Sequence, residues 1–311
     1  MASSKKILYE TNPQLLFNMR SRNSGYTIAE LEEDTNRFVI LPEEIDGVEI
    51  ETIGIRAFEG SSIKGINVGS GIKYINPGAF YNCRRLETVV LPEGLLKIGT
   101  EAFENCTSLR SITLPSTLRY IGAGAFKGCS SIKEIVIPVG VSGVLHNTFK
   151  NCTGLLRVDI QGATEIGKRA FAGCSSLISV RLPDCLETIF DSAFCLCTSL
   201  EEINMPRSLR YVGTLSFAGA AITSLCFSDE MKIIGDRAFG ACDKMISVNF
   251  PVGLGYIGHE AFRECRSLKK IMYEGTAKQW RGVEKGMGWN AGCKCSRMRY
   301  NIPLTQGLTE E

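Results

Sequence analysis

The chain has only two histidines, His146 and His259, and they are its first candidates for acid–base or nucleophilic chemistry. A Ser-His-Asp or Cys-His arrangement requires its members to lie within hydrogen-bond reach of one another. Both histidines fall at variable positions of a repeated turn, and a linear stack of turns brings no distant catalytic partner to them. We therefore expect no catalytic residue in this chain.

Two closely spaced thiol pairs are the candidates for a metal site: Cys195 with Cys197 in "CLC", and Cys293 with Cys295 in "CKC". A structural zinc ion takes four ligands, at spacings such as C-x₂-C. A single C-x-C pair supplies half of that set, and the glycine-rich "GMGWNAG" matches neither a dinucleotide-binding motif nor a P-loop. The sequence therefore predicts no metal and no cofactor.

Composition and charge exclude several classes of protein. Of 311 residues, 44% are hydrophobic and 22% are charged, as in an ordinary folded protein. Lys plus Arg is 35 and Asp plus Glu is 33, so a formal charge of +2 provides no field that attracts nucleic acid. The N-terminal "MASSKKILYETNPQLLF" lacks the apolar stretch of a secretory signal, and no run of about 18 apolar residues occurs. As written, the chain is expected to be soluble and cytoplasmic, without a membrane span or a nucleic-acid partner.

A regular repeat in the sequence determines the structural elements on which the histidines and most of the cysteines lie. The phrase "IGTEAFENC" at 98–106 returns as "IGAGAFKGC" at 121–129, "IGKRAFAGC" at 166–174 and "IGDRAFGAC" at 234–242. Aligned on the phenylalanine, nine intervals span 262 − 58 = 204 residues, a period of roughly 22.7, which lies in the leucine-rich-repeat range. The ten copies are centred on Phe58, Phe80, Phe103, Phe126, Phe149, Phe171, Phe194, Phe217, Phe239 and Phe262.

One copy, residues 116–138, shows how each coil is built. The alternation of Ile135 and Ile137 predicts a short strand with one buried face, and Pro138 ends it. Leu118 and Ile121 predict a second buried wall. Because no coil can bury both walls alone, stacked coils are expected. The sequence therefore predicts a β-rich solenoid of stacked coils with a parallel sheet.

Two further stations recur in most coils. The residue two positions after the phenylalanine is Gly or Asn, which predicts a corner with positive φ, except at Leu196, Ala241 and Glu264. The residue three positions after it is cysteine in eight coils, which predicts an inward column of small, free, buried thiols. In "CLC", Cys197 belongs to this column and Cys195 is expected to be exposed. The column consists of Cys83, Cys106, Cys129, Cys152, Cys174, Cys197, Cys242 and Cys265.

The combined pattern "LxxIxLPxxLxxIGxxAFxxC", legible in 86–106 and 109–129, resembles the BspA-type leucine-rich repeat family. The flanks are also similar: "FVILPEEIDGVEIETIG" resembles that family's first hairpin, and "YEGTAKQWRGVEKGMGWN" resembles its terminal segment. The resemblance implies a leucine-rich-repeat solenoid, a curved, β-rich right-handed superhelix with a parallel sheet on its concave face and without a catalytic centre. It also implies a bacterial or protist protein that acts at the cell surface in adhesion or protein binding.

Three regions are expected along the chain. Residues 1–49 predict an N-terminal β cap, with strands near "KKILYE", "QLLFNM" and "GYTIAEL". Residues 50–274 form the ten-coil solenoid. Residues 275–311 form a C-terminal cap and tail, in which "AKQWRGVEKG" predicts a short helix that buries Trp280, "SRMRYNI" predicts a strand, and residues from about 304 are frayed.

The outward stations of the predicted sheet are the candidates for binding, since alternate strand residues face away from the core. One outward column runs Val90, Thr113, Val136, Asp159, Arg181, Asn204, Cys226, Asn249 and Met272. The middle coils mix both charges, and solenoid sheets form extended binding surfaces. The predicted binding residues are Glu134, Arg157, Asp159, Arg181, Glu202 and Asn204.

A tyrosine column is the alternative binding surface, because outward aromatic rings can stack on sugars or dock a protein. It comprises Tyr74, Tyr120, Tyr211 and Tyr256, whose separation by whole coils argues against a continuous platform. The partner is accordingly a protein or a glycan.

Three hypotheses for function follow. The first is a non-enzymatic binding module at a bacterial cell surface or in the secreted fraction. The second is an intracellular scaffold, favoured by the thiol column. The third is an enzyme with a cleft in the C-terminal cap, near Trp280, Trp289, Cys293 and Cys295.

Overall fold

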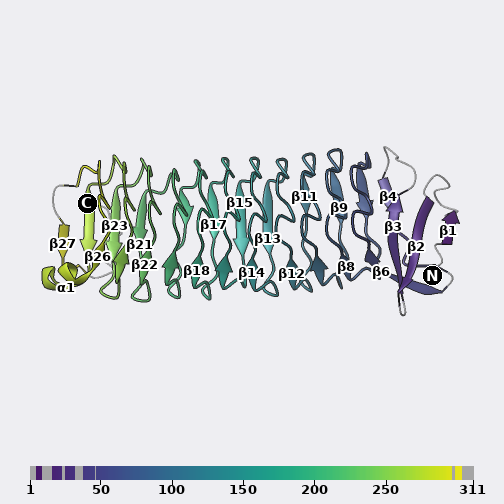
Figure 1. Cartoon of the computed structure of the whole chain (residues 1–311), viewed down its shortest axis with the longest axis horizontal. Coiled ribbons are helices and arrows are strands. Elements are labelled where there is room, and N and C mark those ends of the chain that lie inside the picture. Colours follow the sequence, from purple (N-terminus) through teal and green to yellow (C-terminus); the bar gives the residue numbers. More distant parts are fainter. Residues whose placement is uncertain are drawn as a thin grey trace. The chain divides into compact units, whose positions relative to one another are not determined.

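The protein is described from a computed structural model that covers residues 5–8, 16–22, 25–31, 38–45, 47–295 and 298–302. These residues belong to two compact units, 1–155 and 156–311. Each unit is a stack of coils in which short parallel strands lie side by side (Figure 1). The predicted parallel-strand solenoid is therefore confirmed, while the concave curvature of its sheet stays a prediction.

The first unit begins with longer strands and continues with two short strands per coil. The turns between these short strands bring each new coil back onto the previous one. Its strands are β1 (Lys5–Leu8), β2 (Leu16–Arg22), β3 (Gly25–Leu31), β4 (Phe38–Ile40), β5 (Glu44–Ile45), β6 (Val48–Ile53), β7 (Gly65–Asn67), β8 (Tyr74–Ile75), β9 (Thr88–Val90), β10 (Lys97–Ile98), β11 (Ser111–Ile112), β12 (Tyr120–Ile121), β13 (Glu134–Ile137) and β14 (Gly143–Val144).

Two sheets organise this unit. In the first, β1, β2 and β3 pair antiparallel, and β3 then pairs parallel with β6, from which the ladder continues through β8, β10 and β12. The hairpin of β5 and β6 lies within the segment "FVILPEEIDGVEIETIG". The second sheet is all parallel, in the order β11-β9-β7-β4. The three strands predicted near the N-terminus are thus present as β1, β2 and β3.

The second unit continues the same plan. Its elements are β15 (Arg157–Ile160), β16 (Glu165–Ile166), β17 (Ser179–Arg181), β18 (Thr188–Ile189), β19 (Glu202–Ile203), β20 (Tyr211–Val212), β21 (Ser224–Cys226), β22 (Ile233–Ile234), β23 (Ser247–Phe250), β24 (Tyr256–Ile257), β25 (Lys270–Tyr273), α1 (Ala277–Gly282), β26 (Glu284–Lys285) and β27 (Met298–Tyr300).

One face of the second unit carries two separate parallel sheets, and the other carries one continuous sheet. The first face holds β15, β17 and β19, followed by a new sheet in the order β21-β23-β25-β27. The other face runs β16-β18-β20-β22-β24-β26 without interruption. Because β26 and β27 pair with β24 and β25, strand pairing continues past residue 274, where the sequence repeat ends.

The predicted short helix is α1, and the local sequence explains where it begins. Thr276 is its N-cap: the Thr276 hydroxyl accepts a hydrogen bond from the Gln279 backbone at 3.2 Å, and the Gln279 side chain accepts one from the Thr276 backbone. Trp280 is buried, as expected. Among the residues that the structure describes, α1 is the only helix, and none is long and apolar enough to cross a membrane. The tail predicted from about 304 lies outside the described residues.

Stacked phenylalanines form the centre of each unit. In the first unit the rings of Phe58, Phe80, Phe103, Phe126 and Phe149 stack with centroid separations of 4.9–5.3 Å. In the second unit Phe171, Phe194, Phe217, Phe239 and Phe262 repeat this arrangement at 5.1–5.2 Å. These separations are close to the distance of about 4.8 Å between paired strands, so each coil contributes one ring per step.

The thiol column is confirmed, with one added role and one added member. Its cysteines are free and buried, and they donate S–H hydrogen bonds to the phenylalanine carbonyl of the preceding coil. These bonds measure 2.8–3.2 Å at Cys83, Cys106, Cys129, Cys152, Cys197, Cys242 and Cys265. Cys293 makes the same bond to Phe262 at 3.1 Å, so it continues the column. Cys195, expected to be exposed, is half-buried.

The corners correct the sequence prediction in two ways. Leu196, Ala241 and Glu264, the three exceptions, also have positive φ, between 57° and 60°. A second corner with positive φ lies two residues before every phenylalanine, although seven of its ten residues are neither Gly nor Asn. Its members are Arg56, Gly78, Glu101, Gly124, Asn147, Arg169, Ser192, Leu215, Arg237 and Glu260.

Hydrogen bonds between coils explain the second corner. The backbone N–H of Glu101 donates to Ala123 of the next coil at 2.9 Å, and that of Leu215 donates to Asp236 at 2.9 Å. A left-handed residue directs its N–H towards the neighbouring coil, and this bond offsets the steric cost of about 1–2 kcal/mol that the conformation carries. Tertiary stacking therefore imposes a conformation that the residue types do not signal.

Candidate functional site

A cavity of about 990 Å³ opens on the outward face of β15, β17 and β19 in the second unit. Four of the six predicted binding residues line it: Asp159, Arg181, Glu202 and Asn204. Ser179 of β17 and three residues of the turns after the strands, Gln161, Asp184 and Cys185, complete the polar lining. Sequence reasoning missed these three turn residues because it considered strand positions alone.

The other two predicted residues lie elsewhere. Arg157 is exposed on β15, two residues before Asp159, but it does not line the cavity. Glu134 is exposed on β13 of the first unit. The structure thus brings four of the six side chains together in the second unit, and the binding role of all six stays a prediction.

The strand register sets the positions of the lining side chains. Asp159 pairs with Arg181 in the parallel ladder of β15 and β17, and Ser179 pairs with Glu202 between β17 and β19. The intervening residues Val158 and Val180 are only 3% and 2% exposed, so the strands are anchored by their inward faces. The polar side chains are therefore held on the outer surface at fixed spacing.

Asn204 has a structural role in this cavity. Its side-chain oxygen accepts a hydrogen bond from the Leu182 backbone at 2.7 Å, and its Nδ2 donates to the Leu182 carbonyl at 2.9 Å. The amide thus replaces the backbone partner that Leu182 would have in a longer β19, which ends at Ile203. With both ends of the amide occupied, Asn204 shapes the cavity wall and leaves recognition to its neighbours.

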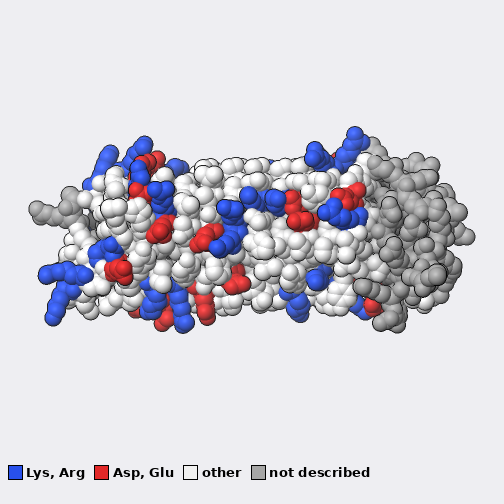
Figure 2. All heavy atoms as spheres, in the orientation of Figure 1, with Lys and Arg blue, Asp and Glu red and all other residues white. Residues whose placement is uncertain are grey.

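The charged groups of the cavity are not neutralised by one another. Asp159, Asp184 and Glu202 provide three carboxylates and Arg181 one guanidinium. Asp159 and Arg181 are ladder partners, yet among the described residues none of these four groups takes part in an ion pair. The one side-chain contact is from Gln161 Nε2 to Asp159 Oδ2, at 3.4 Å. Both signs are interspersed over the visible surface of the described residues (Figure 2), so the cavity is distinguished by its shape and its unpaired groups.

The tyrosine column divides into two short strips. In the first unit Tyr74, Lys97 and Tyr120 are ladder neighbours, and the Lys97 ammonium lies 5.0 Å from the Tyr120 ring centre. This cation–π contact occupies a ring face that a ligand would otherwise use.

The second strip lies in the second unit, where Tyr211, Ile233 and Tyr256 are ladder neighbours. Ile233 is 39% exposed, so the coil between the tyrosines adds apolar surface. Ile233 therefore occupies the expected gap between Tyr211 and Tyr256, and the three residues form a strip across three coils. Burial raises the pKa of the Tyr211 and Tyr256 phenols.

The predicted outward column is wrong near its C-terminal end. Asn249 is 1% exposed and Met272 is 6% exposed, although both occupy outward stations of β23 and β25. Met272 pairs in turn with Arg299 of β27. The sequence repeat did not predict that Asn249 and Met272 would be buried, because it ends before the C-terminal segment that contains β27.

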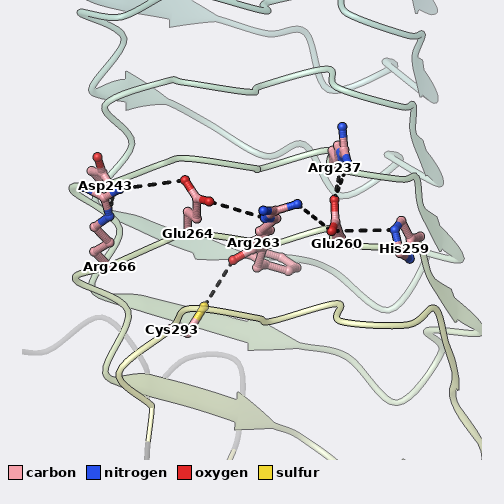
Figure 3. A network of polar contacts seen from close by, with 9 residues as sticks. Arg237, Asp243, His259, Glu260, Arg263, Glu264, Arg266 and Cys293 are labelled. Atoms are coloured by element: carbon pink, nitrogen blue, oxygen red, sulfur yellow. Dashed lines mark hydrogen bonds and ion pairs between the residues drawn. The ribbon is translucent and has the colours of Figure 1, made fainter.

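An ion-pair network of the second unit is centred on Glu260 and includes no residue that lines the cavity (Figure 3). The Glu260 carboxylate accepts hydrogen bonds from Arg237 Nε at 2.6 Å and Arg263 Nη1 at 2.7 Å, and His259 Nε2 lies 3.7 Å away. Burial raises the pKa of Glu260, but the bonds and charges of the two arginines outweigh it and hold that pKa below its ordinary value. The network continues through Glu264, Arg266 and Asp243.

The histidines and thiol pairs have structural surroundings. His259 belongs to this network, His146 is exposed in the first unit, and Cys293 belongs to the thiol column. Among the described residues, no group of three or more His, Cys, Asp or Glu side chains is arranged to hold a metal ion.

Aromatic side chains fill the C-terminal end of the core. Trp280 stacks on Phe250 at 5.7 Å and meets Trp289 at 5.9 Å, while Trp289 contacts Phe262 edge-on at 6.2 Å. The two tryptophans suggested as walls of an enzymatic cleft therefore pack against each other and against the last phenylalanines.

A stack of β coils with an open, charged sheet face defines a class of repeat proteins that bind other molecules along a rigid surface. Residues 51–178 and 164–282 match the family described as "BspA type Leucine rich repeat region", in six copies. These matches include more than half of the chain, and the protein belongs to this family. Its fold supports a repeat-based protein-interaction module.

Two solved structures show the relationship in three dimensions. A leucine-rich repeat protein from Bacteroides ovatus is 27% identical, with a TM-score of 0.73 over 92% of this chain and 77% of that one. The T. pallidum leucine-rich repeat protein is 28% identical, with a TM-score of 0.51 over 70% of this chain and 86% of the other. No curated protein matches the chain at a significant level.

Proposed function

We propose that this chain is a non-enzymatic protein-binding module and that its recognition surface is the outward face of β15, β17 and β19. The observation that carries this proposal is the cavity lined by Asp159, Arg181 and Glu202, three charged side chains that lack an ion-pair partner among the described residues. Charged groups without an internal ion-pair partner can bind a ligand without first breaking such a contact.

The strip of Tyr211, Ile233 and Tyr256 is a second candidate surface, for a glycan or for a protein. Its support is the exposed Ile233, which joins the two tyrosines into one apolar strip. Aromatic residues are frequent at binding hot spots. The first surface is preferred because it combines a cavity with unpaired charges from consecutive coils.

Site-specific photo-crosslinking in the source cells tests the proposed surface. A photoreactive benzoyl-phenylalanine replaces Ser179, inside the cavity, and in a control protein it replaces Glu165, exposed on β16 of the other sheet. We expect a discrete protein adduct from position 179 alone. An excess of purified wild-type chain should suppress the adduct, whereas an excess of the Arg181→Glu variant should not. Equal adducts from both positions would show that the surface is wrongly assigned.

The compartment in which the module acts has two candidates. Family analogy supports a bacterial cell-surface or secreted adhesion protein. The thirteen cysteines, all free, support an intracellular scaffold, because oxidising compartments favour disulfides. Protease shaving of intact source cells, with a cytosolic marker as control, separates the two. Release of peptides from 60–270 without the marker supports the surface role, and recovery only after lysis supports the scaffold.

A further inference from the structure

The charges of the cavity follow a fixed order across three successive coils. Asp159 lies on β15, Arg181 on β17 beside it, and Glu202 on β19 beside Ser179. The signs therefore alternate negative, positive, negative from β15 to β19. Asp159 and Arg181 are register partners on strands about 4.8 Å apart. Glu202 is the register partner of Ser179, two residues before Arg181, so the line through the three charges crosses the strands obliquely. A ligand that follows this oblique line meets the three groups one after another.

Ion pairs between neighbouring coils form elsewhere in the same chain, which makes their absence here informative. Lys127 pairs with Glu104 at 2.8 Å, and Arg237 with Glu260 at 2.5 Å, in each case across one coil. Asp159 and Arg181 are also one coil apart, but no ion pair joins them. Their full charge therefore remains available to a ligand.

We propose that the cavity binds an extended segment of a partner protein that presents a basic, an acidic and a basic side chain, in that order, to Asp159, Arg181 and Glu202. This inference rests on the proposed protein-binding function and names the chemistry of the partner. Complementary charge order across an interface selects the partner and its register, because a segment with inverted signs places like charges together.

The dimensions and the rim of the cavity agree with such a segment. Alternate side chains of an extended chain point to one face at intervals of roughly 6.6–6.8 Å. Asp159 and Arg181 are closer together than this interval, whereas Arg181 and Glu202 are offset along their strands as well as between them. The flexible stems of Lys, Arg and Glu can span both differences. A volume of about 990 Å³ accommodates several side chains. Asp184 adds a third carboxylate to the lining, so the two basic positions of the segment are favoured over the acidic one.

The test uses two acetylated and amidated peptides with the same spacing and opposite signs, Lys-Ser-Glu-Ser-Lys and Glu-Ser-Lys-Ser-Glu. Affinities are measured by calorimetry at low ionic strength, where charge pairs are least screened. The wild-type chain should bind the first peptide more tightly by about tenfold or more, as a loss of complementary pairs predicts. The triple variant Asp159→Lys, Arg181→Glu, Glu202→Lys should reverse this preference.

A matched control separates charge order from net charge. The triple variant is more positive than wild type by two units, and Glu165→Lys, on the other sheet, produces the same change. This control should keep the wild-type preference. If the triple variant does not fold, Arg181→Glu alone should abolish the preference.

Equal affinity of the wild-type chain for both peptides, or reversal by Glu165→Lys, would overturn the proposal. The proposed function is judged separately by the Ser179 adduct. If that adduct persists and is competed while the peptides are not distinguished, the charge order is wrong and the binding surface stands. If the adduct is also lost, both proposals fail.

Discussion

The thiol of Cys106 donates a hydrogen bond to the carbonyl oxygen of Phe80, one coil earlier, at a distance of 3.2 Å. The column of cysteines therefore joins successive coils as well as filling space. Cys106→Ala removes both the bond and the sulfur atom from a fully buried site. We expect it to lower the free energy of unfolding by about 1–2 kcal/mol. Cys106→Ser should lower the free energy of unfolding by less, because the serine hydroxyl keeps the hydrogen-bond donor. Urea unfolding of both variants measures the difference. Equal losses would contradict the hydrogen-bonding role of the thiol.

Thiol reactivity should follow burial in the native protein. Burial raises the pKa of the Cys106 and Cys197 thiols well above their ordinary value, so these residues hold almost no thiolate. Cys185 is exposed at the cavity. Iodoacetamide labelling followed by mass spectrometry should therefore modify Cys185 first and the column only after unfolding. Rapid native labelling of Cys106 would refute the packing described here.

The phenylalanine stack should carry a large share of the stability. Phe126 lies between Phe103 and Phe149, at 5.3 Å from each. Phe126→Ala should lower the free energy of unfolding by about 3–5 kcal/mol. The exposed Val136 of β13 provides a control, and Val136→Ala should change stability by about 0.5 kcal/mol or less. Similar losses in the two variants would mean that the rings do not hold the coils together.

Leu196 offers a stabilising substitution, because it has a φ of 60° and an exposed side chain. Asparagine tolerates this conformation better than leucine does. Leu196→Asn should therefore raise the free energy of unfolding by up to about 1 kcal/mol. Leu196→Ala, which keeps the steric cost, is the control and should not stabilise. A lower melting temperature for Leu196→Asn would argue against strain at this corner.

The pH dependence of stability should reveal the Glu260 network. Because its two arginine partners lower the pKa of Glu260 in the folded protein, ionised Glu260 stabilises the fold above its unfolded-state pKa of about 4.3. This contribution is lost as the pH falls through the lower folded-state pKa. Melting temperatures of wild type and Glu260→Gln should therefore differ at pH 7 and converge in acid. A difference that is constant from neutral to acid pH would exclude the charge as its source.

The repeat made most of the fold predictable, because each residue of the repeated pattern occupies an equivalent position in its coil. The stacked phenylalanines, the buried thiols and the Gly or Asn corners after seven of the ten phenylalanines follow from residue type and spacing. The corner before each phenylalanine did not, since Arg237 and Leu215 adopt positive φ through hydrogen bonds to the next coil and not through local preference. Cys293 was missed as a column member because Trp289 and Asn290 replace the Ala-Phe pair that marks the other coils.

The candidate site was predictable to the extent that strand alternation determines it. Alternation placed Asp159, Arg181 and Glu202 on one outward face, and the cavity contains all three. It could not reveal that Asn204 is engaged by the backbone of Leu182, nor that Asp184 and Cys185 of a turn complete the cavity. These contacts depend on where β19 ends and on the path of the following turn.

Hydrogen–deuterium exchange with the captured partner distinguishes directly between the cavity and the strip of Tyr211, Ile233 and Tyr256 as the recognition surface. The chain is compared with and without the protein that crosslinks to position 179. We predict slower exchange in 157–160, 179–181 and 202–204, and no change in 211–212, 233–234 and 256–257. Protection confined to 211–212, 233–234 and 256–257 would contradict recognition by the cavity. It would assign recognition to the strip of Tyr211, Ile233 and Tyr256.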